Sequence, residues 1–188
     1  MKHSFKNIQG FTLVELVVSI GIFALMTTLL LAKYGTFNQG IILTNLAYDV
    51  ALTVRNAQSY GLNVKSAPTA GENFSSDFNY SYGVHFSSNS NTFTFFKDAD
   101  NYLYDNPTLE KISDSVMKRN SKISALCVGT VTACSSVSTL DVVFKRPNPD
   151  AIINGVSSNS YAEITLQGSD GSIRKVVVRS TGQIAVQN

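Results

Sequence analysis

A carboxylate inside an apolar run is the feature of this sequence with the clearest chemistry. From Phe11 to Ala32 the only ionisable side chain is that of Glu15. At about 1.5 Å per residue, a helix over this run would measure about 33 Å, enough to cross a hydrocarbon core of about 30 Å. An unpartnered charge in such a segment costs about 2.5–3.5 kcal/mol on insertion scales. Glu15 therefore requires a cationic partner.

Cleavage of the chain after Gly10 would create that partner. The new α-amine would be carried by Phe11, at the membrane depth of Glu15 in a neighbouring subunit shifted along the helix axis. Two charges that are costly when alone would then neutralise each other.

The stretch from Gly10 to Glu15 (Gly-Phe-Thr-Leu-Val-Glu) follows a short basic leader and opens the apolar run. In this combination it resembles the class III signal of type IV pilins and type II secretion pseudopilins. The resemblance implies that a prepilin peptidase cuts between Gly10 and Phe11, that Phe11 is then N-methylated, and that Glu15 guides subunit docking. All three positions match the family's motif.

Two other interpretations of this segment fit less well. An ordinary secretory signal has an apolar region of about 7–15 residues followed by a small-residue cleavage site, whereas here the run is longer and the glycine precedes it. A plain single-span anchor explains the length and the basic leader, with Lys2, His3 and Lys6, but leaves Glu15 unexplained. We therefore expect a leader over residues 1–10 and a transmembrane helix over residues 11–32.

The composition indicates one globular head beyond the membrane span. The chain has 188 residues, of which 44% are hydrophobic and 15% charged. The formal charge is +2, but Lys2 and Lys6 lie in the leader, so the side chains of the processed chain carry equal numbers of basic and acidic groups. A balanced charge gives no support to a general nucleic-acid binder.

A helical period resumes after the span, over residues 33–62. The apolar positions recur at the spacing of one helix face, and polar residues occupy the opposite face. The apolar residues are Leu43, Leu46, Ala47, Val50, Val54 and Ala57. Gly35 and Gly40 predict a soft segment between the two helical parts, because glycine costs about 1 kcal/mol relative to alanine in a helix. Gly61 is the expected stop.

Strand patterns dominate residues 63–188. After a polar loop over Asn63–Asp77, alternation predicts a hairpin of Tyr82–Phe86 and Phe93–Phe95 whose aromatic face packs on the helix. Leu109, Ile112 and Val116 indicate a short helix or an irregular strand. Further strands are expected at Ser124–Val131, Thr139–Phe144, Tyr161–Leu166, Ile173–Arg179 and Gln183–Val186.

The last three of these strands form an antiparallel meander in this interpretation. The C-terminal strands and the helix Leu46–Tyr60 are similar to those of H-type pseudopilins and related minor pilins. The expected fold is therefore α+β and pilin-like, a long N-terminal helix packed on an antiparallel β-sheet head.

The remaining reactive side chains give little support to an enzyme. Cys127 and Cys134 would lie on the side of the membrane where disulfides persist, so a bridge is expected, with free buried thiols as the alternative. No histidine or further cysteine is near enough in sequence to suggest a metal site. A catalytic serine or cysteine needs a base in reach, but His85 is the single histidine beyond the leader and lies on an aromatic strand, and the two cysteines are expected to pair. We expect no catalytic residue, no metal and no cofactor.

Two charged stretches have alternative interpretations. The segment Asp98–Asp105 is rich in oxygen donors and could hold calcium, as some major pseudopilins do, but it lacks the glycine and spacing of a calcium loop, which favours a solvated turn. The basic run of Lys118, Arg119 and Lys122 is typical of a solvated face. Together with Arg174, Lys175 and Arg179 it would otherwise form a patch for nucleic acid.

These observations predict a structural subunit of a type IV pilus or a type II secretion pseudopilus. Its expected partners are copies of itself or related pilins, the prepilin peptidase, an assembly platform and the inner membrane. We expect a single span in the cytoplasmic membrane with the head outside the cytoplasm, followed by incorporation into a filament. The alternative is a DNA-uptake minor pilin whose head binds nucleic acid. The presence of Glu15 disfavours one subtype, the tip pseudopilin of type II secretion, which characteristically lacks this glutamate.

Overall fold

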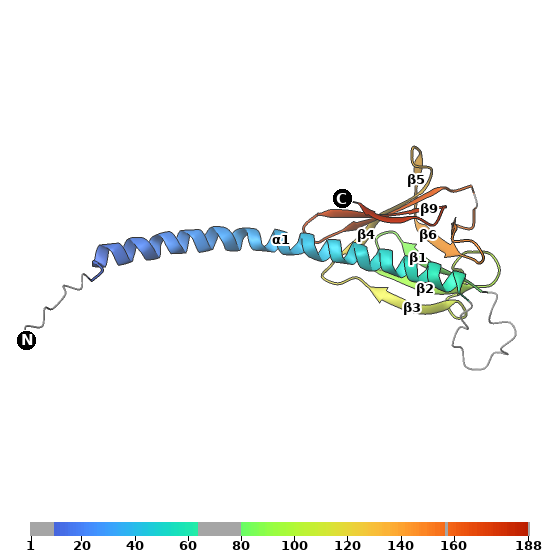
Figure 1. Cartoon of the computed structure of the whole chain (residues 1–188), viewed down its shortest axis with the longest axis horizontal. Coiled ribbons are helices and arrows are strands. Elements are labelled where there is room, and N and C mark those ends of the chain that lie inside the picture. Colours follow the sequence, from blue (N-terminus) through green and yellow to red (C-terminus); the bar gives the residue numbers. More distant parts are fainter. Residues whose placement is uncertain (1–9, 64–79, 157, 188) are drawn as a thin grey trace, which may run out of the picture. The chain divides into compact units, whose positions relative to one another are not determined.

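The computed structural model of the chain describes residues 10–63, 80–156 and 158–187, and for residues 33–38 only the backbone (Figure 1). Within these residues, one helix, α1, runs from Leu13 to Leu62, and ten strands follow it. The predicted loop Asn63–Asp77 lies outside the described residues except for Asn63. The expected α+β fold is confirmed and is consistent with a pilin-like architecture.

The chain divides into two compact units, residues 1–38 and 39–188. The first unit contains an apolar stretch, Leu13–Ala32, with a mean hydropathy of 2.3 and none of its residues buried. This stretch is long and apolar enough to cross a membrane. The backbone of α1 is helical through Gly21, Gly35 and Gly40, so the predicted soft segment is not a break in the helix.

The second unit contains two antiparallel sheets of five strands each. One sheet has the strand order β3-β2-β1-β6-β7 and the other β10-β9-β8-β4-β5. The strands are β1 (Ser81–Ser87), β2 (Thr92–Asp98), β3 (Lys111–Val116), β4 (Lys122–Gly129), β5 (Cys134–Val137), β6 (Thr139–Phe144), β7 (Ala151–Ile153), β8 (Tyr161–Gln167), β9 (Ile173–Arg179) and β10 (Ile184–Gln187).

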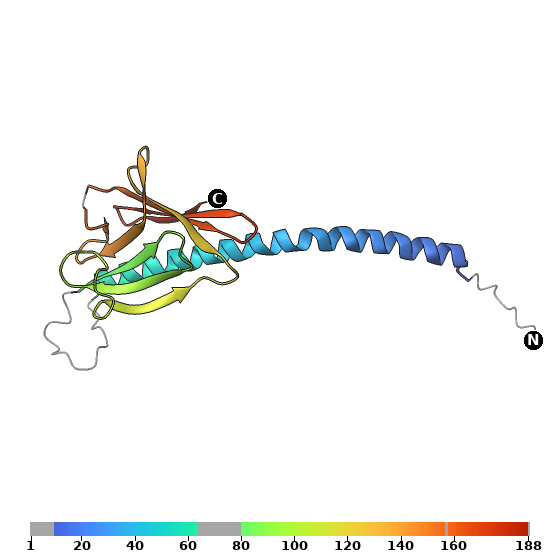
Figure 2. The same cartoon turned by 180° about the vertical axis from the view of Figure 1, so that it is seen from behind.

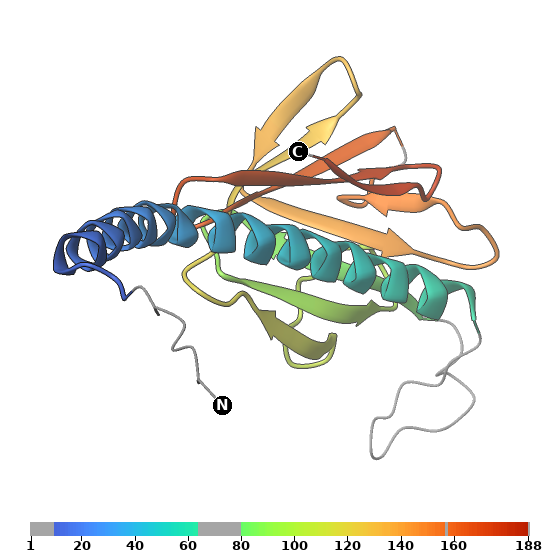
Figure 3. The ribbon, with the colours of Figure 1, turned by 60° about the vertical axis from the view of Figure 1, so that its left-hand side comes forward.

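The core of this unit lies between α1 and both sheets. Figures 2 and 3 show the part of α1 that belongs to the unit lying along the two sheets. The helix contributes a fully buried face at the predicted spacing: Leu43, Ala47, Val50, Val54 and Ala57. The predicted aromatic hairpin is confirmed as β1 and β2, with Phe86 paired to Phe93 and Val84 to Phe95. The inward side chains of both strands are buried against the helix.

The structure settles one open alternative and corrects two expectations. Lys111–Val116 form a strand at the edge of a sheet, so the strand rather than the short helix is confirmed for this segment. Leu46 is only half-buried, because it lies at the border of the buried helix face. Gly61 does not end α1 but lies inside it, where a Cβ would come within 2.5 Å of the carbonyl oxygen of Phe144. The glycine is therefore required for close packing of α1 on β6.

Candidate functional site

The peptide bond between Gly10 and Phe11 lies in an exposed segment just before α1. Neither residue is helical, and Phe11 is 85% exposed. A Cβ at Gly10 would meet nothing within 4 Å. A bond in this setting is accessible to a peptidase, because a protease needs an extended and uncovered substrate segment.

Glu15 makes a capping box with Thr12 at the start of α1. The Glu15 Oε2 atom accepts hydrogen bonds from the Thr12 main-chain N–H at 3.1 Å and from the Thr12 hydroxyl at 3.0 Å. The Glu15 N–H in turn donates to the Thr12 hydroxyl oxygen at 3.2 Å. This reciprocal pair satisfies N–H groups that a helix start leaves without partners. The Thr-x-x-Glu spacing could have been recognised in the sequence, but we did not predict this second role for Glu15.

The polar side chains of the apolar stretch are satisfied within the helix itself. The hydroxyls of Ser19, Thr27 and Thr28 donate to main-chain carbonyl oxygens three or four residues earlier, at 2.7–3.0 Å. A hydroxyl bonded in this way does not present an unpaired polar group to lipid. Glu15 remains the one carboxylate of the stretch Leu13–Ala32.

Cys127 and Cys134 are joined by a disulfide in the β4–β5 hairpin. Cys127 pairs across the ladder with Ser136, and Cys134 with Gly129, so the bridge is diagonal. The Cα atoms are 5.7 Å apart, within the usual range for a bridged pair. The bridge closes the hairpin near its tip, where Thr130 and Ala133 form the turn.

His85 lies between a carboxylate and a hydroxyl, which are the residue types of a hydrolytic triad. Its Nδ1 atom is 2.7 Å from Asp141 Oδ1 and its Nε2 atom 3.1 Å from the Ser87 hydroxyl. A hydrolase also needs free N–H groups to stabilise an oxyanion. The N–H groups after Ser87, those of residues 88–90, donate to carbonyl oxygens of Ser138, Ile123 and Ser87 itself. We therefore interpret His85 as a bridge between β1 and β6.

The acidic segment after β2 is not the fully solvated turn that the sequence favoured. Oxygen atoms of Asp98, Asp100 and Glu110 lie within 4.8 Å of one another, and Asp98 and Glu110 are buried. Burial raises the pKa of both Asp98 and Glu110. Main-chain N–H groups stabilise the two carboxylates: those of residues 100–102 donate to Asp98, and those of Asp105 and Asn106 to Glu110. Of the four carboxylates between Asp98 and Glu110, Asp100 and Asp105 are the exposed ones.

The basic residues considered for nucleic acid do not form one continuous patch. Lys118 and Arg119 are exposed on the β3–β4 connection, and Lys122 is exposed at the start of β4. Arg174 donates to the Thr44 hydroxyl, and Lys175 pairs with Glu163 at 2.8 Å. Arg179 lies at the opposite end of β9 from Arg174, about 17 Å away for five strand residues. Arg174 and Lys175 are thus engaged by partners within the head, and Arg179 lies apart from Arg174.

Comparison with known proteins locates a family likeness in the N-terminal segment. Residues 5–31 match the family model described as the prokaryotic N-terminal methylation motif. Comparisons of the chain with curated proteins and with solved structures give no match. The matched residues include Gly10, Phe11 and Glu15. Residues 5–31 therefore carry the N-terminal methylation motif, which is the signature of type IV pilins and pseudopilins.

Proposed function

We propose that the chain is a structural subunit of a type IV pilus or a type II secretion pseudopilus. The observation that carries this proposal is the methylation motif at residues 5–31, with Glu15 at its fifth position after the cleavage-site glycine. In the proposed life cycle, prepilin peptidase cuts between Gly10 and Phe11 and methylates Phe11. The span over residues 11–32 then holds the subunit in the cytoplasmic membrane, with the head outside the cytoplasm.

The proposed segments of the chain follow from this life cycle. Residues 1–10 are the leader, residues 11–32 the transmembrane helix, residues 33–62 its amphipathic continuation and residues 63–188 the β-rich head. The buried helix face from Leu43 to Ala57 supports a continuation that is anchored in the head.

Assembly in this proposal depends on Glu15 pairing with the Phe11 amine of a neighbouring subunit. The capping box uses only Oε2 of Glu15, and Oε1 accepts no hydrogen bond from the described residues. A carboxylate has about four acceptor sites on its two oxygens. Glu15 can therefore cap its own helix and still accept a cationic amine. Inside lipid, removing one partner of such a pair costs about 3–5 kcal/mol, because the other charge stays buried.

Two variants separate assembly from capping. Glu15→Ala removes both roles, whereas Thr12→Ala removes the capping hydroxyl, worth about 1 kcal/mol, and keeps the carboxylate. We expect both variants to enter the membrane and lose ten residues by intact mass. Glu15→Ala should be nearly absent from sheared fibres relative to the membrane pool, while Thr12→Ala should assemble within about tenfold of wild type, since tenfold corresponds to 1.4 kcal/mol. Glu15→Gln should be intermediate.

The result would contradict the proposal in either of two ways. If the full leader remains on the protein, the chain is not a prepilin peptidase substrate. If Glu15→Ala and Thr12→Ala reduce assembly equally, Glu15 acts only as a helix cap and the pairing with the Phe11 amine is rejected. A DNA-uptake minor pilin is the second candidate, but Arg174 is bonded to Thr44 and Lys175 is paired with Glu163, which gives it little support.

A further inference from the structure

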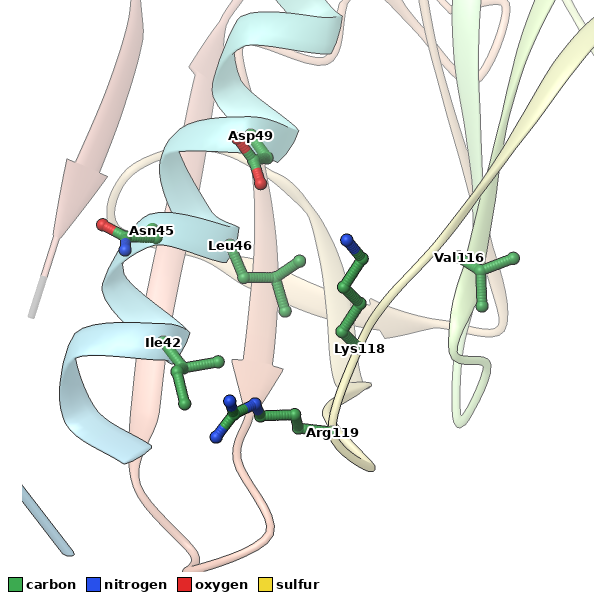
Figure 4. A pocket seen from close by; sticks show the side chains of 7 residues that line it. All are labelled: Ile42, Asn45, Leu46, Asp49, Val116, Lys118 and Arg119. Carbon is green, nitrogen blue, oxygen red and sulfur yellow. The ribbon is translucent and has the colours of Figure 1, made fainter. Parts of the chain in front are cut away.

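An apolar groove with a basic rim lies between α1 and the β3–β4 connection. Its apolar lining consists of Ile42, Leu46 and Val116, the last of which is 62% exposed. Figure 4 shows the side chains of Lys118 and Arg119 extending from the connection toward α1. The groove has a volume of about 260 Å³, below the roughly 300–1,000 Å³ of small-molecule pockets. Its size suits a few side chains of a docking protein.

The rim carries a positive charge that the head does not neutralise. Lys118 and Arg119 are exposed, and within the described part of the chain neither of them forms an ion pair. Asp49, on the helix side of the groove, is the one carboxylate in the lining. The cations outnumber it, so a complementary partner would present an apolar side chain together with carboxylates.

The β2–β3 loop of the same head has this complementary chemistry. Between Asp98 and Glu110 the sequence contains four carboxylates and no basic residue. Leu109 is 64% exposed, and the carboxylates of Asp100 and Asp105 are exposed on the same loop. Leu109 and these two acidic residues line one hollow of the surface.

Hydrogen bonds hold this loop in one conformation before any partner binds. The N–H groups of Leu109 and Glu110 donate to Asn106 O at 3.1 and 2.9 Å, and the Lys97 N–H donates to Glu110 O at 2.9 Å. The Glu110 carboxylate accepts two further N–H groups from the loop. A preorganised loop loses little conformational entropy on docking.

The groove and the loop lie at opposite ends of β3, so one head cannot bring them together. The loop ends at Lys111 and the groove begins at Val116, five strand residues or about 17 Å further. Figures 1 and 2 show the loop near the C-terminal end of α1 and the β3–β4 connection at the other end of the head. A contact between two different surfaces of identical chains is heterologous, and when it does not close into a ring it builds an open filament.

We propose that the β2–β3 loop of one copy docks head to tail into the groove of a second copy. Leu109 enters the space between Ile42, Leu46 and Val116, and Asp100 and Asp105 face Lys118 and Arg119. This inference rests on the proposed filament function and adds the contact between heads to it. The helix pairing through Glu15 and this head contact would then act on the same filament.

Charge reversal with rescue tests the contact in the full-length protein. Arg119→Glu and Asp105→Lys, each made alone, are expected to lower the ratio of sheared-fibre to membrane-pool subunit about tenfold or more, since each places like charges together at the rim. The two changes in one chain should restore the ratio to within about twofold of wild type, because the attraction is re-formed with reversed signs. Arg179→Glu and Asp150→Lys, which make the same charge changes on exposed residues elsewhere, should assemble normally.

A photo-crosslink gives a second measurement that does not depend on charge. With p-benzoylphenylalanine in place of Leu109, irradiated fibres should give a crosslinked dimer whose peptides contain residues 42, 46 or 116. If wild-type fibres form but the Leu109 variant gives no such crosslink, the head contact is overturned and the filament function stands. The same holds if the fibre-to-membrane ratio of the double variant is no higher than that of the worse single variant. Absence of wild-type fibres would instead reject the function. Loss of DNA binding by Arg119→Glu with normal assembly would assign the rim to nucleic acid and overturn the contact.

Discussion

Replacing Gly61 by alanine tests how closely α1 must approach β6. The added Cβ would lie 2.5 Å from the carbonyl oxygen of Phe144 and 2.9 Å from the Cβ of Phe144. These atoms belong to the backbone and first side-chain carbon of a buried strand residue, so they cannot move aside as the end of a flexible side chain would. The same change at Gly40, also within α1, meets nothing within 4 Å and is the matched control.

The expected magnitude follows from two opposing terms. Alanine is favoured over glycine inside a helix by about 1 kcal/mol, so Gly40→Ala should raise the free energy of unfolding by up to that amount. At Gly61 the gain is smaller, because the residue is next to the end of α1, and overpacking opposes it by about 1–3 kcal/mol. The free energies of unfolding of the two variants should therefore differ by about 1–4 kcal/mol. For a unit of this size, each kcal/mol corresponds to about 2–4 °C in Tm.

The assay is thermal unfolding of the full-length protein in detergent micelles, followed by near-UV circular dichroism. That signal reports on the aromatic cluster beside Gly61, in which Tyr60 lies 5.5 Å from Tyr82 and 5.4 Å from Phe95, measured between ring centroids. Gly61→Ala should lower the Tm and weaken the signal, while Gly40→Ala should keep the signal and raise the Tm. If both variants melt at the same temperature, α1 does not pack on β6 as closely as the structure indicates.

Three further predictions concern the head. Replacing both Cys127 and Cys134 by alanine should lower the free energy of unfolding by about 2–3 kcal/mol in the chain-entropy model, because the bridge closes a loop with a sequence separation of 7. Non-reducing peptide mapping that finds both thiols free in extracytoplasmic material would contradict the bridge. Calcium at about 1 mM, which matches the dissociation constants of weak extracellular calcium-binding modules, should leave the Tm unchanged, because main-chain N–H groups already stabilise Asp98 and Glu110. A rise of several degrees in Tm would show a calcium site. Burial raises the pKa of Glu110 in the folded state above its unfolded value, so the stability that this group contributes is complete below the unfolded pKa of about 4 and is lost as the pH rises through the folded pKa. Glu110→Gln should therefore gain in Tm relative to wild type as the pH rises above about 4, and a difference that stays constant with pH would refute this.

The sequence by itself determined the features that depend on local pattern. Glu15 in an apolar run, the glycine before Phe11 and the length of the run identified the processing motif, because each depends only on residue type and spacing. The buried helix face from Leu43 to Ala57 and the hairpin of Phe86 and Phe93 followed from the helical and strand periods. The capping box of Thr12 and Glu15 was also readable in this way, although it was not predicted.

Only the tertiary structure decided which distant residues meet. Glu110 joins Asp98 because β2 and β3 pair, and Asp98 is buried although the sequence favoured a solvated turn there. Gly61 is needed because β6 passes under the end of α1, and His85 meets Asp141 because β1 and β6 pair in register. The groove likewise exists because the β3–β4 connection lies beside Ile42 and Leu46. Such contacts depend on strand order and register, which arise from packing both sheets on one helix and have no signature in the local spacing of residues.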